Sequence, residues 1–367
     1  MRICVLSKVA DRSERALVKG LAERGHSITY VAEARDPVLD ERGQAGMRVH
    51  TADFRRKFDR SCARDLKEIF LQGRFDLVYA TGSRTLTTGL LAARGTTLPF
   101  ITYRGHLGRV SYLNPLNRLA QLNSRVQRII VNSAAIRNAL IDCRVPADRI
   151  AVVYKGYARE WYAGARPIRR DEHGIPDDQF LIGCVANFRP DKGGETLLQA
   201  LALIPPEIPI HLALVGEIQD RAILRTIRRL GLRDRVTMTG YRDDALDWTA
   251  GFDLSVMPSK RESFSRAIVE SIAIGTPVIV TAVGGMPELV LDGRTGIVVE
   301  PSNPAALAAA IMEAYRNPAR MRSFAEAGRQ HLADRFSVDR YVQGMERVFG
   351  EVCLENQRKG KKMNEER

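Results

Sequence analysis

Two glutamates stand eight residues apart in the second half of the chain, around the start of an expected helix. Glu262 lies in the loop after a strand expected over 252–259, and Glu270 lies about two turns into a helix expected over 265–275. The residues at the entrance of that helix are Ser263, Phe264 and Ser265. Unpaired N–H groups and the positive end of the helix dipole make such an entrance favourable for a diphosphate. Two flanking carboxylates can accept hydrogen bonds from hydroxyl groups on either side, which matches the ribose, pyrophosphate and hexose of a nucleotide sugar.

A basic loop follows another expected strand, at 180–187, and precedes a helix expected over 194–204. Arg189 and Lys192 lie in this loop, where they can clamp a diphosphate and stabilise it as a leaving group. No carboxylate pair in a supporting context indicates a metal site, and basic groups can replace a metal ion in neutralising the leaving group. An ordinary solvated loop is the alternative.

Short strands and helices alternate along the whole chain. This alternation predicts an α/β protein with parallel sheets, which bind ligands beyond the carboxyl ends of their strands. Two series of such elements predict two doubly wound, Rossmann-like domains, over 1–165 and 166–335, that face a cleft. The stretch 165–179 has two prolines and no apolar periodicity, so it is expected to be the linker. A helix over 336–353 is expected to end the folded part, and 354–367 to form a disordered tail.

The glutamate pair opens a series of three linked motifs. Glu262-Ser-Phe-Ser-Arg-Ala-Ile-Val-Glu270 is followed by Ala273-Ile-Gly-Thr-Pro-Val278 and then by Gly284-Gly-Met-Pro-Glu288. In this order and spacing they resemble the retaining glycosyltransferases of family 4, which have the GT-B fold. The resemblance implies that Glu262 contacts hydroxyl groups of the donor sugar, that Glu270 holds the ribose, and that the helix over 336–353 crosses back onto the first domain. Two solvated charges on a helix are the alternative.

The resemblance also implies further donor contacts in the second half. The family commonly has an arginine five residues before its Lys-Gly, where this chain has Asn187. Either Arg189 reaches the same phosphate from a shifted position, or only Lys192 does. Loops that border the base in the family correspond here to strand ends at Gly216, Gly240 and Tyr241. Plain turns are the alternative for these strand ends.

The first half resembles the family only in outline. The loop after the first strand contains no glycine, and Arg104 stands where the family usually has a histidine. His106 is the candidate substitute for that catalytic histidine, with a solvated loop histidine as the alternative. The other possibility is that Arg104 itself replaces the histidine, in a purely electrostatic role on the acceptor side.

Positive charge is concentrated in the first half. Residues 1–170 hold 31 Lys and Arg against 15 Asp and Glu, whereas residues 171–367 hold 25 against 28. Anionic lipid headgroups, phosphorylated glycans and nucleic acid all fit such a half, although no nucleic-acid motif accompanies it, and an arginine-rich composition without a partner is the alternative. The basic amphipathic stretch 54–72 predicts core packing behind a solvated basic face, with peripheral contact to an anionic membrane as the alternative.

Apolar runs and cysteine spacing indicate where the protein is located and whether it binds metal. No run approaches the roughly 18 apolar residues of a membrane-spanning helix, and the first residues do not form a secretory signal. The protein is therefore expected in the cytoplasm, with peripheral contact to the inner face of the membrane. Five widely spaced cysteines without metal-ligand spacing predict buried, reduced thiols.

These features together predict a retaining, metal-independent glycosyltransferase of the hexosyltransferase type. It would use a nucleotide-diphosphate sugar as co-substrate, with no other cofactor, and a glycan or lipid-linked acceptor, in the synthesis of lipopolysaccharide or another surface polysaccharide. No nucleic-acid partner is expected. The alternatives are a nucleotide-sugar epimerase or a phosphorylase of the same architecture, and a non-catalytic protein that retains the donor pocket.

Overall fold

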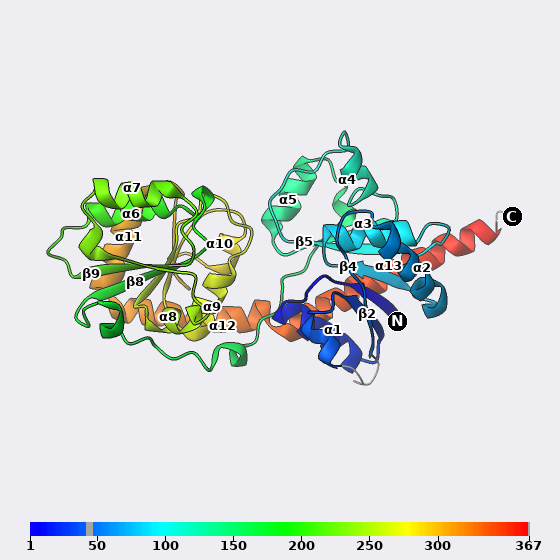
Figure 1. Cartoon of the computed structure of the whole chain (residues 1–367), viewed down its shortest axis with the longest axis horizontal. Helices are drawn as coiled ribbons and strands as arrows, with labels where there is room; N and C mark the ends of the chain where they lie inside the picture. Colours follow the sequence, from blue (N-terminus) through cyan, green and yellow to red (C-terminus); the bar gives the residue numbers. More distant parts are fainter. Residues whose placement is uncertain (42–46, 366–367) are drawn as a thin grey trace. The chain divides into compact units, whose positions relative to one another are not determined.

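The computed structural model describes residues 1–41 and 47–365 and divides into two compact units (Figure 1). Unit 1 comprises Met1–Gly156 together with Phe336–Arg367, and unit 2 comprises Tyr157–Arg335. Each unit contains one parallel sheet with helices packed on it. The predicted α/β fold with two doubly wound domains is confirmed.

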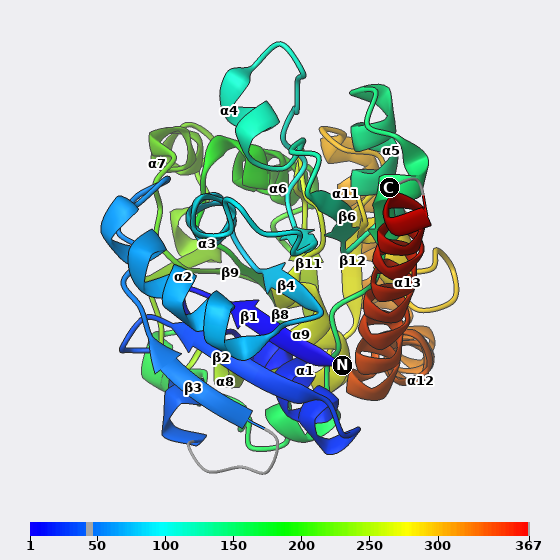
Figure 2. The ribbon, with the colours of Figure 1, turned by 90° about the vertical axis from the view of Figure 1, so that its right-hand side faces the viewer.

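Unit 1 contains a seven-stranded sheet with the order β3-β2-β1-β4-β5-β6-β7, of which the part β3-β2-β1-β4 can be followed in Figure 2. The strands are β1 (Arg2–Leu6), β2 (Ser27–Ala32), β3 (Met47–Thr51), β4 (Leu77–Ala80), β5 (Phe100–Arg104), β6 (Val126–Val131) and β7 (Ile150–Val152). The helices are α1 (Arg12–Glu23), α2 (Arg60–Gly73), α3 (Ser83–Ala92), α4 (Pro115–Leu119), α5 (Ala134–Asp142) and α13 (Val338–Glu365).

Apolar side chains on both faces of this sheet explain why helices cover it on two sides. Successive residues of a strand point to opposite faces, so Ile3 and Val5 of β1 join one core while Cys4 and Leu6 join another. Helices α1 and α13 pack in the first core, and α2, α3 and α5 pack in the second. A sheet that is covered on both faces needs strands that are continuously apolar. The sequence of β1 is such a continuous apolar run.

The last helix, α13, packs on unit 1 through a buried stripe. Tyr341, Met345 and Phe349 are fully buried against α1 and the sheet. The helix continues to Glu365, through residues that the sequence predicted to be a disordered tail. The stripe extends to the buried Val352, and Glu355 pairs with Arg128 of β6. These tertiary contacts favour continuation of the helix beyond residue 353.

Helix α2 lies within the basic amphipathic stretch 54–72, and its apolar face is part of the core, as predicted. Cys62, Leu66 and Phe70 are buried against the sheet and α3. The prediction of core packing therefore describes the apolar face of this helix.

Unit 2 contains a six-stranded parallel sheet with the order β10-β9-β8-β11-β12-β13. The strands are β8 (Phe180–Val185), β9 (Ile210–Val215), β10 (Val236–Gly240), β11 (Leu254–Met257), β12 (Val278–Thr281) and β13 (Ile297–Val299). The helices are α6 (Gly194–Leu203), α7 (Arg221–Arg229), α8 (Ala245–Gly251), α9 (Arg266–Ile274), α10 (Met286–Leu289), α11 (Pro304–Arg316) and α12 (Pro318–Phe336).

The stretch predicted to be the linker, 165–179, belongs to unit 2. Ile175 is buried in a small core with Trp248 and Phe252. The Arg170 guanidinium donates hydrogen bonds to the carbonyl oxygen of Gly251 and to the Asp253 carboxylate, both at 2.9 Å. The units therefore divide at residues 156 and 157, rather than at the predicted 165 and 166.

None of the five cysteines forms a disulfide. Cys4, Cys62 and Cys184 are buried, whereas Cys143 and Cys353 are partly exposed. Burial raises the pKa of the Cys62 and Cys184 thiols to about 12. Within the described part of the chain, no helix has the length and apolar character needed to cross a membrane.

Candidate functional site

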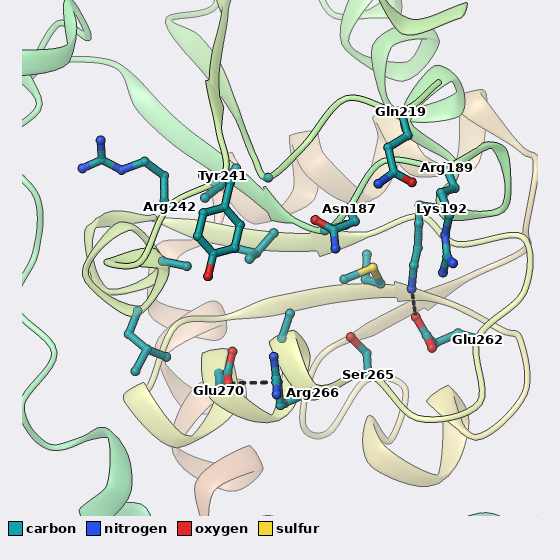
Figure 3. Close-up of a pocket in the computed structure, with 18 of the residues that line it drawn as sticks. Asn187, Arg189, Lys192, Gln219, Tyr241, Arg242, Glu262, Ser265, Arg266 and Glu270 are labelled. Carbon is teal, nitrogen blue, oxygen red and sulfur yellow. Dashed lines mark hydrogen bonds and ion pairs between the residues drawn. The ribbon is translucent and has the colours of Figure 1, made fainter. Parts of the chain in front are cut away.

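A pocket of about 550 Å³ lies in unit 2 beyond the carboxyl ends of its central strands (Figure 3). This size is typical of sites for small ligands. Among its lining residues are nine that the sequence singled out: Asn187, Arg189, Lys192, Gly216, Tyr241, Glu262, Phe264, Ser265 and Glu270. Ser263 and Gly240, also predicted, are adjacent in sequence to lining residues but are not part of the lining.

Hydrogen bonds between loops hold the separate motifs together. The backbone N–H of Lys260 donates to the carbonyl oxygen of Asp191 at 2.8 Å, which joins the glutamate loop to the basic loop. The N–H of Gly285 donates to the carbonyl oxygen of Ser263 at 2.9 Å, which joins the glutamate loop to the Gly-Gly motif. These contacts explain why three motifs that are separate in sequence act as one structural block.

The lining of the pocket includes an ion pair between Lys192 and Glu262. Lys192 Nζ lies 2.6 Å from Glu262 Oε2, and the two side chains are only 17% and 11% exposed. The second carboxylate oxygen of Glu262 accepts the N–H of Ser263 at 3.2 Å. Because an ammonium group has three hydrogens, Lys192 can bind a further anion without leaving Glu262.

Arg189 lies beside Lys192 in Figure 3 but is much more exposed. Its side chain is 58% exposed, and its nearest acidic partner is Asp191 at 3.7 Å. Asn187, where the family commonly has arginine, is exposed and lines the same pocket. Within the basic loop, Lys192 is therefore the enclosed cation, and Arg189 is an exposed one.

Helix α9 begins at the floor of the pocket, as the sequence predicted. Ser265 is its N-cap, and Ser265 Oγ accepts the N–H of Ile268 at 3.4 Å. The Phe264 ring stacks on Tyr157, with 6.4 Å between ring centroids and 9° between planes. The partial positive charge of a helix start thus lies on the lining of the pocket, next to Lys192.

Glu270 lies one turn into α9 on the pocket side and is mostly buried. The guanidinium of Arg266 lies 3.5 Å from its carboxylate, at the i,i+4 spacing that brings side chains together on a helix. Arg266 was missed in the sequence, although this spacing was available as a signal. Gln219 and Arg242 also line the pocket without having been predicted, and the sequence around them offered no comparable signal.

Gly216 lies at the end of β9, where only glycine fits. Its φ of 130° is unfavourable for other residues, and a Cβ atom would lie 2.0 Å from the carbonyl oxygen of Ala186. Gly216 donates its N–H to the carbonyl oxygen of Gly240 at 2.8 Å. Gly216 thus forms a β-bridge with Gly240, and it also lines the pocket. Tyr241, next along the chain, is exposed at the rim.

The two candidates of unit 1 differ in their surroundings. Arg104 is buried at the end of β5, and its guanidinium donates to Gln121 Oε1 at 2.7 Å and to the carbonyl oxygen of Gly108 at 2.5 Å. His106 is exposed, and partial desolvation together with the charge of Arg104 lowers its pKa. The described contacts of Arg104 are structural, and the roles of both residues with an acceptor remain predictions.

Two family models match successive parts of the chain. Residues 11–161 match the model described as Glycosyltransferase Family 4, and residues 165–331 match the model described as Glycosyl transferases group 1. The chain belongs to this family of glycosyltransferases. The resemblance inferred from the three linked motifs is confirmed.

Individual relatives are distant. The chain is 30% identical to N-acetyl-alpha-D-glucosaminyl L-malate synthase of Bacillus anthracis over 52% of its own length and 50% of that protein. It is 31% identical to D-inositol 3-phosphate glycosyltransferase of Segniliparus rotundus over 63% of its own length and 54% of that protein. The matches thus span only about half of these relatives.

The fold as a whole resembles solved structures. HepE of Anabaena, determined in complex with UDP, superimposes with a TM-score of 0.76 over 96% of this chain and all of that chain, at 24% identity. At this identity the likeness concerns the fold, which is GT-B as predicted.

Proposed function

We propose that the chain is a glycosyltransferase that binds a nucleotide-diphosphate sugar in the pocket of unit 2 and transfers the sugar to an acceptor. The observation that carries this proposal is the enclosed Lys192–Glu262 pair next to the start of α9, with Glu270 in the same pocket. The cation and the helix start match the diphosphate of such a donor. The two carboxylates match the hydroxyl groups of the sugar and the ribose on either side of it. UDP in the HepE complex supports a uridine nucleotide as the first to test.

The diphosphate would lie against Lys192 and the first turn of α9. These positive groups are held in place before the reaction. They would stabilise the negative charge that develops on the leaving diphosphate, and the site would not have to rearrange to do so. Glu262, held by Lys192, would accept hydrogen bonds from the sugar, and Glu270 from the ribose. Transfer would proceed with retention, the acceptor attacking the face from which the diphosphate leaves.

The acceptor is proposed to be anionic and to bind unit 1. The net charge of residues 1–170 favours such a partner. The names of the two relatives point the same way, since malate and inositol 3-phosphate are both anions. A glycan or lipid-linked acceptor that carries phosphate, as in lipopolysaccharide or surface-polysaccharide synthesis, remains our proposal within this class.

A thermal-shift screen against UDP-, GDP- and ADP-sugars tests donor binding. A ligand at 100 times its Kd stabilises the folded state by about 2.7 kcal/mol, and each kcal/mol raises the Tm of a unit this size by roughly 2–4 °C. Glu270→Ala is expected to remove most of that shift, because the ribose loses its acceptor. Glu326→Ala removes an exposed glutamate–arginine pair on α12, outside the lining of the pocket, and should keep the full shift. An unchanged shift in Glu270→Ala would contradict the ribose assignment.

Chelation tests the absence of a metal requirement. Because Lys192 and the helix start are proposed to supply the positive charge, turnover of the donor should stay the same within error after EDTA treatment. The measurement is donor consumption with and without EDTA, followed by addition of Mg²⁺ or Mn²⁺. Loss of activity that either metal restores would show that this part of the proposal is wrong.

A further inference from the structure

The connection from β5 to β6 in unit 1 is anchored at both of its ends. The buried Arg104 guanidinium bonds Gly108 near one end and Gln121 near the other. Val110 and Leu122, next to these anchors, are buried in the core of unit 1. The part between the anchors is therefore a fixed feature of the fold.

Between the anchors, residues 109–119 turn large apolar side chains outward; we name this segment the apolar loop. Leu113 is 94% exposed, and Leu116 and Leu119 are each about half exposed, at 51% and 49%. Tyr112 is also exposed. In the described part of the chain, no other stretch of eight residues has as many exposed large apolar side chains.

Local hydrogen bonds hold the apolar loop in this conformation. Asn114 Oδ1 accepts the N–H of Leu116 at 2.9 Å, which caps the short helix α4. Ser111 Oγ accepts the N–H of Leu113 at 3.2 Å. An ordered loop that presents leucine to water loses hydrophobic stabilisation unless another apolar phase covers it, so a cluster of this kind marks an interaction surface.

The charge around the apolar loop is of one sign. From Leu77 to Ile141 the sequence contains eight arginines and no aspartate, glutamate or lysine. Arg109 and Arg118 flank the exposed leucines and are themselves exposed, and Arg84 starts α3 after the neighbouring strand β4. Among the residues that the structure describes, no ion pair involves any of these three arginines.

We propose that the apolar loop docks unit 1 on a phospholipid bilayer with anionic headgroups. Leucines would enter the boundary between headgroups and acyl chains, while Arg109 and Arg118 would contact lipid phosphates. The arginines favour an anionic surface as the partner, because the charges are complementary. The exposed leucines favour a lipid over a water-soluble glycan. The docking surface differs from α2, for which membrane contact was the alternative interpretation and whose apolar face lies in the core.

Vesicle sedimentation with the full chain tests this proposal. Vesicles of phosphatidylcholine with 30 mol% phosphatidylglycerol, as a chosen probe, are compared with pure phosphatidylcholine at about 50 mM and 500 mM NaCl. Binding is expected to the anionic vesicles at low salt and to weaken at high salt. Arg109→Ala/Arg118→Ala should lower the partition coefficient roughly 25-fold, because each basic residue contributes about 5-fold. Leu113→Ser/Leu116→Ser should lower it by about 10-fold or more.

Leu71→Ser and Leu203→Ser are the matched controls, since they replace exposed leucines of α2 and α6 outside the apolar loop. They should bind vesicles like the natural chain, and all variants should unfold at the same temperature. Equal binding to neutral vesicles, retained binding by the loop leucine variant, or equal loss in the controls would overturn the proposal. So would light scattering that shows a dimer which Leu113→Ser/Leu116→Ser splits, because a second copy would then cover the loop. Donor binding in unit 2, followed by thermal shift, is read independently of these outcomes.

Discussion

Replacing Lys192 with alanine is expected to slow donor turnover by about 10²–10³-fold, the usual effect of removing one preorganised group that stabilises a developing charge. Lys192 is mostly buried beside Glu262, whereas Arg266, another cation of the lining, is exposed and pairs with Glu270. Arg189→Ala should have a smaller effect, because Arg189 is exposed to solvent, which weakens its electrostatic contribution. The measurement is single-turnover consumption of the donor that gives the largest thermal shift.

Two further variants separate chemistry from folding in this prediction. Lys192→Ala leaves the mostly buried Glu262 without its cationic partner, which is itself destabilising. The double variant Lys192→Ala/Glu262→Gln should recover the Tm but not the turnover. Lys260→Ala, in the same loop as Glu262, keeps its backbone bond to Asp191 and should turn over donor at the natural rate. Turnover by Lys192→Ala at the natural rate would rule out its role with the leaving group.

Gly193→Ala is expected to destabilise unit 2 strongly and to abolish donor binding. Gly193 has a φ of 70°, and a Cβ atom there would lie 1.9 Å from the carbonyl oxygen of Pro258, far inside any real contact. The loop that carries Lys192 would have to move away from β11, at a cost of about 3 kcal/mol or more in unfolding free energy. Chemical denaturation and the donor-induced thermal shift measure the two effects.

Gly231→Ala is the matched control for this backbone substitution. Gly231 has nearly the same φ, 66°, but no atom within 4 Å of the position of a Cβ. Its loss should be limited to the conformational cost of about 1–2 kcal/mol for a left-handed residue. Equal destabilisation by the two substitutions would mean that the contact with Pro258 relaxes without cost, and the steric argument would fail.

The local pattern of apolar residues explains why most helices and strands could be predicted. Contacts between distant parts of the chain explain those that were missed. Strands such as β1 and β9 are short, continuous apolar runs, which buried parallel strands require. Helix α3 was missed because its threonines are weak helix formers. In the fold, Thr87 and Thr88 accept the N–H groups of Phe58 and Asp59 at 3.3 Å, contacts made only after α2 and α3 pack together.

The sequence by itself determined the two-domain α/β class, the family and the helix start between Glu262 and Glu270, because periodicity and motif spacing are local properties of the chain. Only the tertiary structure decided that Lys192 pairs with Glu262, seventy residues away, since contacts between loops bring them together. It also decided which apolar side chains are covered: α2 buries its apolar face, whereas Leu113 of the apolar loop stays in solvent. Burial depends on what packs against a residue, and amphipathic spacing alone does not specify that partner.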